Sequence, residues 1–251
     1  MNNEPLGGPA ESRTSADARA EALGTKAASL VPLVSERLEA ARRRIEAAGG
    51  DPAAVTIVAV TKTFGPGYAL AALACGIQDL GENYADELVE KARALDEAAV
   101  PPARWHFLGS IQRNKIGRLA PFVDCWQGVS RPVEVEAIVR RSPGPVRLFV
   151  EVNLAGDPSR PGCDPAAVPG LLEAARATGA EVRGLMAVAP HGDADVAEGA
   201  FRRLAAMARS LGLDELSMGM SADLESAVRA GTTMVRLGTA LFGPRNPRAT
   251  R

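Results

Sequence analysis

Aromatic residues, histidine and cysteine are all scarce in this chain. Of its 251 residues, 4% are aromatic, three are cysteine and two are histidine. The cysteines Cys75, Cys125 and Cys163 are scattered and have no CxxC spacing, so they predict neither a disulfide framework nor a zinc site. The histidines, His106 and His191, are too few for a histidine-based metal cluster.

The chain also lacks an excess of charge of either sign. Lysine and arginine total 29 against 30 aspartates and glutamates, for a net charge of −1. Nucleic-acid-binding proteins usually carry a basic excess or a basic face, so we expect no nucleic-acid partner. The only dense basic cluster, Arg42 to Arg44, lies within an amphipathic pattern and is interpreted as the solvated face of a helix.

Long apolar runs are missing as well. No segment approaches the roughly 20 apolar residues of a membrane-spanning helix. The polar N-terminus has no apolar core of a secretory signal. We therefore expect a cytoplasmic protein with no membrane partner.

The chain is instead rich in small and branched apolar residues. Hydrophobic residues reach 46% of the chain although aromatics are few, so the core must consist of alanine, valine, leucine and isoleucine. Such a core suits parallel strands that are covered by helices on the outside. The length of 251 residues is also usual for a barrel of eight strands and eight helices.

The chain divides into two short tails and one domain. Residues 1–25 are polar without apolar periodicity and are predicted to form a flexible N-terminal tail. Apolar residues at helical spacing predict an extra helix over 27–48. The barrel domain is expected over 26–245, and a C-terminal tail over 246–251.

Within that domain, eight strand-like segments alternate with helix-like segments. Strands are predicted at 55–60, 77–80, 104–108, 122–126, 146–153, 182–188, 215–218 and 234–237. Helices are predicted at 68–75, 85–95, 115–119, 132–141, 165–178, 195–210 and 222–230. This order predicts a single α/β domain folded as a (β/α)₈ TIM barrel. A doubly wound open sheet is the competing fold, but no GxGxxG sequence follows the first strand.

Lys62 is the first candidate for chemistry, because active sites of such barrels lie at the carboxyl ends of the strands. It follows the apolar first strand and Thr61. A lysine drawn into a partly apolar barrel mouth loses stability in its charged form. Its neutral amine can then attack an aldehyde and form an imine. The ordinary alternative is a strand-end lysine that reaches solvent.

The loops after the last two strands contain a predicted phosphate site. Ser221 precedes the helix at 222–230, where it is expected as the N-cap, and backbone N–H groups there favour an anion. Gly238 would allow close backbone approach, and Thr239 supplies a hydroxyl and an N–H. Arg236, on the eighth strand, is expected to point inward toward the ligand or to pair with Glu82 or Glu151. An amine facing a phosphate site fits a small phosphorylated aldehyde, either pyridoxal 5′-phosphate (PLP) or a phosphosugar of a Schiff-base aldolase.

The ordered series of motifs resembles the YggS/PROSC family of PLP homeostasis proteins, whose fold is similar to the barrel of alanine racemase. The resemblance extends over residues 30 to 245. The matching segments are VAVTKT (58–63), GENY (81–84), WHFLG (105–109), Gln112, Asn114, Lys115, GLM (184–186), LSMGMS (216–221), MVRLGT (234–239) and Phe242-Gly243.

The resemblance implies a role for several residues. Lys62 would carry PLP as a Schiff base, and Asn83 would lie beside its ring. Ser221, Gly238 and Thr239 would hold the phosphate with help from the backbone of Met220. Arg236 would meet the pyridine nitrogen, and because arginine does not give up its proton, that nitrogen would stay unprotonated. His106 is expected in the barrel near the cofactor.

The resemblance also implies a protein that carries PLP without turning over a substrate. Alanine racemases of this fold have a second domain that contributes a tyrosine as the second acid/base group. Here the chain ends soon after the eighth predicted strand, and its two tyrosines, Tyr68 and Tyr84, lie in the first third. We therefore expect a monomeric, non-catalytic PLP-binding protein that acts in PLP homeostasis, with PLP-dependent apo-enzymes as recipients. An amino-acid racemase is the alternative.

Overall fold

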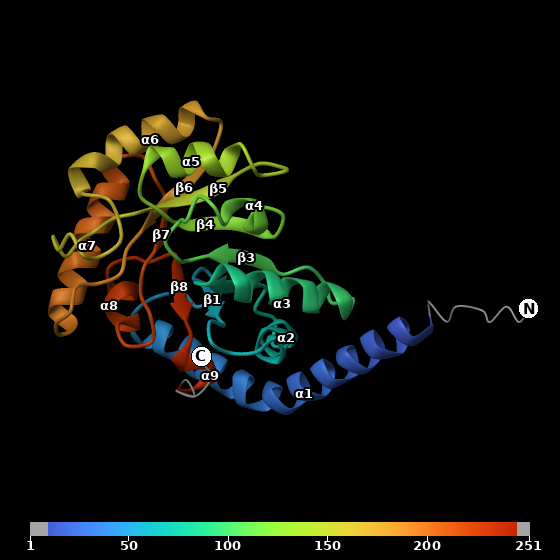
Figure 1. The fold of residues 1–251 in the computed structure, drawn as a ribbon. Helices are drawn as coiled ribbons and strands as arrows, with labels where there is room; N and C mark the ends of the chain where they lie inside the picture. Colours follow the sequence, from blue (N-terminus) through green and yellow to red (C-terminus); the bar gives the residue numbers. More distant parts are fainter. Residues whose placement is uncertain (1–9, 245–251) are drawn as a thin grey trace, which may run out of the picture.

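The computed structural model describes residues 10–244, and Figure 1 shows them as a barrel of strands within a layer of helices. The strands are β1 (Thr56–Val60), β2 (Asp79–Glu82), β3 (Arg104–Phe107), β4 (Val123–Val129), β5 (Arg147–Glu151), β6 (Glu181–Met186), β7 (Glu215–Ser217) and β8 (Met234–Leu237). Each strand pairs in parallel with the next, and β8 pairs with β1, so the barrel is closed. The predicted (β/α)₈ fold is therefore confirmed.

Helices follow the strands around the outside of the barrel. They are α1 (Ala10–Ala47), α2 (Pro66–Ala74), α3 (Ala85–Glu97), α4 (Ile116–Leu119), α5 (Pro132–Val139), α6 (Val168–Ala177), α7 (Ala194–Ser210), α8 (Leu224–Arg229) and α9 (Thr239–Phe242). A 3₁₀ turn at Pro165–Ala167 precedes α6, and α9 is a short element that the sequence did not predict. None of the helices within residues 10–244 is both long and apolar enough to cross a membrane.

The extra helix α1 begins earlier than the sequence predicted. It starts at Ala10, so residues 10–25, which were expected in a flexible tail, belong to a helix. No residue from 17 to 26 is buried, and that exposure explains the missing apolar periodicity. Alanine, glutamate and arginine favour a helix by intrinsic propensity, and they can extend one whose other end is packed. The rest of the expected tails, 1–9 and 246–251, lies outside the described residues.

Buried positions later in α1 attach this helix to the barrel. Val34, Leu38 and Ile45 are almost fully buried at helical spacing. They belong to the main apolar core, and α1 packs against α2, α8 and α9. In Figure 1 it runs along the lower side of the barrel, next to α2 and α9.

Strand β2 lies later than expected, at Asp79–Glu82 rather than 77–80. Every residue of β2 is buried, including two carboxylates. Buried charges are rare unless they are paired, so the apolar pattern favoured Ile77 as the start of the strand. Both carboxylates have partners in the folded protein: Asp79 pairs with Arg104, and Glu82 pairs with Lys91.

Candidate functional site

A cavity of about 320 Å³ opens at the carboxyl ends of the strands, the end where barrel enzymes hold their ligands. All seven residues predicted for cofactor binding line it: Lys62, Asn83, Met220, Ser221, Arg236, Gly238 and Thr239. They lie on or shortly after four strands, β1, β2, β7 and β8. Only closure of the barrel brings them to one cavity.

A buried ionic cluster fixes the backbone on both sides of Lys62. The Lys91 ammonium, 2% exposed as a residue, donates to the backbone oxygen of Thr61 at 2.8 Å. It also donates to Glu82 Oε1 at 2.5 Å and to Glu87 Oε2 at 2.8 Å. Burial raises the pKa of the Glu82 carboxyl, and the charge of Lys91 opposes that rise.

The two residues beside Lys62 bind this cluster directly. Thr61 donates its hydroxyl to Glu82 Oε1 at 2.6 Å. The N–H of Thr63 donates to Glu87 Oε2 at 2.7 Å, and Thr63 has a φ of 67°. A β-branched residue adopts this left-handed conformation only when its surroundings compel it. The cluster therefore determines the direction in which the chain leaves β1 at Lys62.

Arg236 is buried in the cavity wall and held on one side by acceptors. Its Nη1 donates to the backbone oxygen and to Oγ of Ser217, both at 2.7 Å, and its Nη2 donates to Ala187 O at 2.9 Å. Desolvation lowers the pKa of Arg236 to about 10, which still leaves it a cation at neutral pH. Among the described residues it forms no ion pair within 4.0 Å with Glu82 or Glu151, the alternative partners considered from the sequence.

Ser221 has a different role from the predicted N-cap. Asp223 occupies the N-cap of α8, and its Oδ1 accepts from the N–H of Met220 at 2.5 Å. Ser221 Oγ instead accepts from the N–H of Ala240 in α9 at 3.0 Å. The serine thus joins the loop after β7 to the turn after β8, and the backbone N–H of Met220 is already engaged.

Helix α1 supports the same loop through Arg44. The guanidinium donates to both carboxylate oxygens of Glu225, at 2.6 and 2.8 Å, and to the backbone oxygen of Ser221 at 3.0 Å. The interpretation of Arg42 to Arg44 as a purely solvated face was therefore wrong for Arg44. A sequence pattern places a residue on a face but does not show which loop will fold against that face.

Gly238 packs closely against β1. A Cβ on Gly238 would lie 3.3 Å from the backbone oxygen of Val60, which is closer than most side chains tolerate. The absence of a side chain thus lets the turn after β8 approach β1 just before Lys62. The sequence had assigned the glycine to ligand approach alone.

Glu151, at the end of β5, is a cavity residue that the predicted ligand set omitted. Burial raises its carboxyl pKa to about 7, Arg236 opposes the rise, and Glu134 adds to it. A glutamate at the end of a core strand was a visible signal, but it was considered only as a partner for Arg236. The cavity therefore contains a carboxyl group in addition to the amine of Lys62 and the guanidinium of Arg236.

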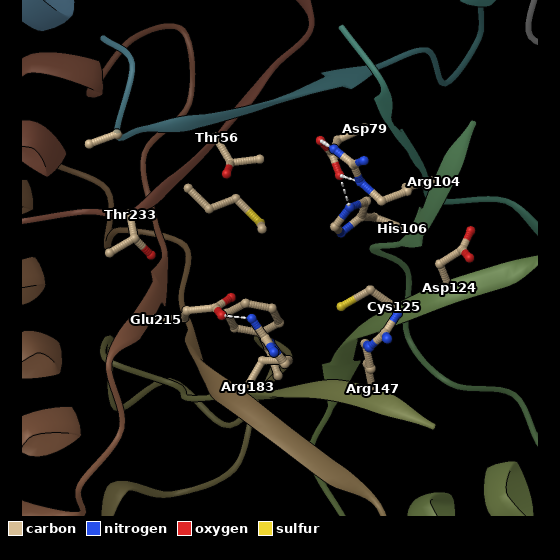
Figure 2. Close-up of a pocket in the computed structure, with 13 residues that line it drawn as sticks. Thr56, Asp79, Arg104, His106, Asp124, Cys125, Arg147, Arg183, Glu215 and Thr233 are labelled. Atoms are coloured by element: carbon tan, nitrogen blue, oxygen red, sulfur yellow. Dashed lines mark hydrogen bonds and ion pairs between the residues drawn. The ribbon is translucent and has the colours of Figure 1, made fainter. Parts of the chain in front are cut away.

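His106 does not lie in this cavity. It lines a separate cavity of about 530 Å³ at the amino ends of the strands, together with Asp79 and Arg104 (Figure 2). The expectation that His106 would lie near the cofactor is therefore wrong. Its position within β3 was correct, but the sequence did not show how deep in the barrel the ring would point.

The charges in this second cavity neutralise each other. Asp79 binds Arg104 through both oxygens, at 2.9 and 2.6 Å. Arg183 pairs with Glu215 across the opposite side of the cavity in Figure 2. Arg147 contacts Glu181 at 3.2 Å. These three arginines have carboxylate partners, so the cavity lacks the uncompensated positive charge of an anion site.

Comparisons with known proteins converge on one family. The alanine racemase N-terminal domain family matches residues 35–246. The pyridoxal phosphate homeostasis protein of Pseudomonas aeruginosa is 39% identical, over 82% of this chain and 91% of that protein. The structure of PipY from Synechococcus elongatus with PLP bound has a TM-score of 0.73 and 31% identity, covering 84% of this chain and 100% of PipY. Alanine racemase from Corynebacterium glutamicum is similar in fold alone, with a TM-score of 0.61 and 21% identity over 86% of this chain and 61% of the racemase.

Replacement of Lys91 by methionine should destabilise the fold. Lys91→Met leaves Glu82 buried without its cation, and loss of one partner of a buried ion pair costs about 3–5 kcal/mol. Urea denaturation of the protein without ligand measures the loss. The double variant Lys91→Met/Glu82→Gln, which removes both charges, should recover part of it. An unchanged denaturation midpoint in Lys91→Met would show that the cluster contributes nothing.

Glu151 should make the protein less stable as the pH rises. Its pKa increases from 4.5 to about 7 on folding, so the folded state binds the proton more tightly. Stability from this group is thus present below pH 4.5 and is lost as the pH rises toward 7, by on the order of 2–3 kcal/mol. Denaturation at several pH values should show a shallower decline for Glu151→Gln than for wild type. The exposed Glu173→Gln serves as the control and should follow wild type.

Proposed function

Since the chain belongs to the pyridoxal phosphate homeostasis protein family, with the barrel of the alanine racemase N-terminal domain, we propose that Lys62 holds PLP as a Schiff base and that the protein serves intracellular PLP homeostasis. One observation supports this above all. Lys62 and the proposed phosphate-binding residues Ser221, Gly238 and Thr239 line one cavity, although they are more than 150 residues apart in the sequence.

The cavity suits the chemical parts of PLP. The Lys62 amine would form a C=N bond with the aldehyde carbon, and the aldehyde oxygen would leave as water. The Ser221 and Thr239 hydroxyls can donate to phosphate oxygens. A volume of about 320 Å³ lies at the lower end of the range for small-molecule sites.

Arg236 fits the position opposite the pyridine nitrogen. The bound cofactor would supply an aldehyde and an electron-withdrawing ring. A ring nitrogen that faces a guanidinium stays unprotonated, because the arginine remains a donor. That weakens the ring as an electron sink compared with a carboxylate partner. The residue thus favours retention of PLP over reaction through it.

The surroundings of the tyrosines support a non-catalytic role. Tyr68 packs against Phe64 and Phe242, with ring centroids 4.7 and 5.6 Å away. Tyr84 is exposed and lines a neighbouring depression. Neither of the two tyrosines in the chain lines the Lys62 cavity. The obvious second proton-transfer group of a racemase is therefore not beside Lys62.

An amino-acid racemase is the second candidate, and Glu151 is the observation that favours it. Its carboxyl lies in the cavity with a pKa of about 7, which suits proton transfer at neutral pH. We nevertheless place cytoplasmic delivery of PLP to apo-enzymes first, because the named relatives are homeostasis proteins.

Absorption spectroscopy tests the proposed link to Lys62. Wild-type protein mixed with PLP should develop the band of a protonated imine at the edge of the visible range, and Lys62→Ala should lose it. Lys115→Ala removes a lysine from the neighbouring depression and should keep the band. A band that survives in Lys62→Ala and disappears in Lys115→Ala would show that Lys115, and not Lys62, forms the Schiff base.

Turnover and transfer assays separate the two candidate functions. The loaded protein should restore activity to a PLP-dependent apo-enzyme, and it should leave the optical rotation of single L- or D-amino acids unchanged. Amino-acid racemisation that is lost in both Lys62→Ala and Glu151→Gln would establish the racemase instead.

A further inference from the structure

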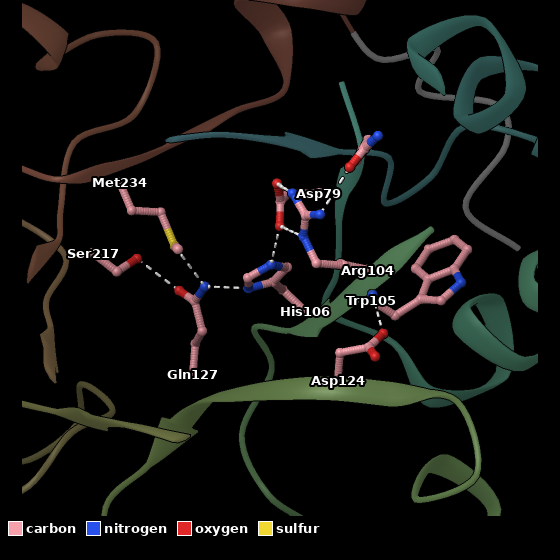
Figure 3. Close-up of polar contacts among 9 residues, drawn as sticks. Asp79, Arg104, Trp105, His106, Asp124, Gln127, Ser217 and Met234 are labelled. Atoms are coloured by element: carbon pink, nitrogen blue, oxygen red, sulfur yellow. Dashed lines mark hydrogen bonds and ion pairs between the residues drawn. The ribbon is translucent and has the colours of Figure 1, made fainter. Parts of the chain in front are cut away.

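A continuous chain of hydrogen bonds crosses the interior of the barrel and joins the two cavities. At one end, Asp79 Oδ1 lies 2.9 Å from His106 Nε2. His106 Nδ1 lies 2.7 Å from Gln127 Nε2, and Gln127 Oε1 lies 2.6 Å from Ser217 Oγ. Figure 3 shows these contacts in line, and Ser217 Oγ then accepts from Arg236 Nη1 at 2.7 Å.

The direction of every bond in this chain follows from its two ends. Arg236 can only donate, so Ser217 Oγ accepts from it and turns its own hydrogen toward Gln127 Oε1. The amide nitrogen of Gln127 therefore faces His106 and donates to Nδ1. The remaining ring hydrogen of His106 is on Nε2.

That hydrogen meets a permanent acceptor. Burial raises the pKa of the Asp79 carboxyl, but the hydrogen bonds from His106 and Arg104 outweigh that effect and hold the pKa below its usual range, so this residue is a carboxylate. The second N–H of Gln127 donates to the sulfur of Met234 at 3.1 Å. Each donor has an acceptor only if His106 is neutral and protonated on Nε2.

The chain lies in a part of the barrel where polar side chains are costly. Gln127 and Ser217 are fully buried, and His106 is 4% exposed. Their neighbours in the barrel interior include the apolar cluster of Val58, Cys125, Phe149, Met186 and Met234. A buried amide without partners destabilises the fold by about 1–3 kcal/mol. Apolar side chains would fill this space without that desolvation cost. Stability alone does not explain a polar connection here.

We propose that Gln127 and His106 are positioning residues for Arg236, an inference that rests on the proposed PLP site. Gln127 keeps the Ser217 hydroxyl hydrogen turned away from the guanidinium. Ser217 can then anchor Nη1 with both of its oxygens, while Ala187 anchors Nη2. His106, fixed by Asp79, in turn holds the Gln127 amide in the required orientation. The chain thereby presents a rigid guanidinium to the ring of the cofactor.

Binding measurements with Gln127→Met test this role. Methionine has a similar volume but has no N–H to donate to His106, and its sulfur is only a weak acceptor for the Ser217 hydroxyl. The dissociation constant for PLP should rise about five-fold, the effect of one net hydrogen bond, and the maximum of the imine band should shift. Because Gln127 acts through Ser217, the double variant Gln127→Met/Ser217→Ala should bind no more weakly than Ser217→Ala alone.

A matched control separates positioning from general loss of stability. Thr232 is also buried but does not belong to the chain of hydrogen bonds. Its hydroxyl contacts the backbone oxygens of Leu216, Met218 and Met234. Thr232→Val should lower the denaturation midpoint and keep both the PLP affinity and the imine band. Gln127→Met with affinity within two-fold of wild type and an unshifted band would overturn the proposal.

Nitrogen-15 NMR of the histidine rings tests the chain of hydrogen bonds in protein without PLP. The protein has only two histidines, so the His106 signals can be assigned by comparison with His191→Asn. Wild-type His106 should be the neutral Nε2–H tautomer. Gln127→Met should keep this tautomer, because Asp79 still accepts from Nε2, but it should shift the Nδ1 signal, because Nδ1 loses the N–H donor of Gln127. An Nδ1–H tautomer in wild type would disprove the bond directions. If wild-type protein forms no imine band with PLP, the proposed function fails, and the proposed role of the hydrogen bonds in positioning Arg236 for PLP fails with it. The tautomer of His106 still decides whether the chain of hydrogen bonds has the stated directions.

Discussion

Closure of the parallel sheet between β1 and β8 is the constraint on which the candidate site depends. The pairing of Ala59 with Leu237 places the end of β1 beside the end of β8. Lys62 leaves one strand there, and Gly238 and Thr239 leave the other. The missing Cβ of Gly238 lets its turn approach the Val60 oxygen. Without this closure, the amine and the phosphate-binding groups would lie at opposite edges of an open sheet.

Buried charge gives this mouth its rigidity. Lys91 binds two carboxylates and the backbone oxygen of Thr61, and these hydrogen bonds fix the start of the loop that carries Lys62. On the other side of the cavity, Arg236 is held by Ser217 and Ala187. Both arrangements are costly to bury and are compensated by near-complete pairing. They restrict the two groups that would meet opposite ends of the PLP ring system.

The barrel interior is divided between an apolar cluster and a polar connection. Most side chains in a barrel of this kind fill space, and Val58, Phe149 and Met186 do so here. Gln127 bridges strands on opposite sides instead, from His106 on β3 to Ser217 on β7. The cavity at the amino ends of the strands is thereby connected to the proposed cofactor site, although its own arginines are neutralised.

The sequence by itself determined the alternation of strands and helices and the set of residues at the strand ends. Both depend on local periodicity and on the rule that the functional residues of such barrels lie at the carboxyl ends of the strands. Seven predicted residues accordingly line one cavity. Tertiary structure alone decided which polar groups meet. It gave Asp79 and Glu82 their buried cations, moved Ser221 from capping α8 to bonding with Ala240, and placed His106 at the far end of the barrel. These outcomes depend on contacts between residues distant in sequence, whose distances and directions no local pattern encodes.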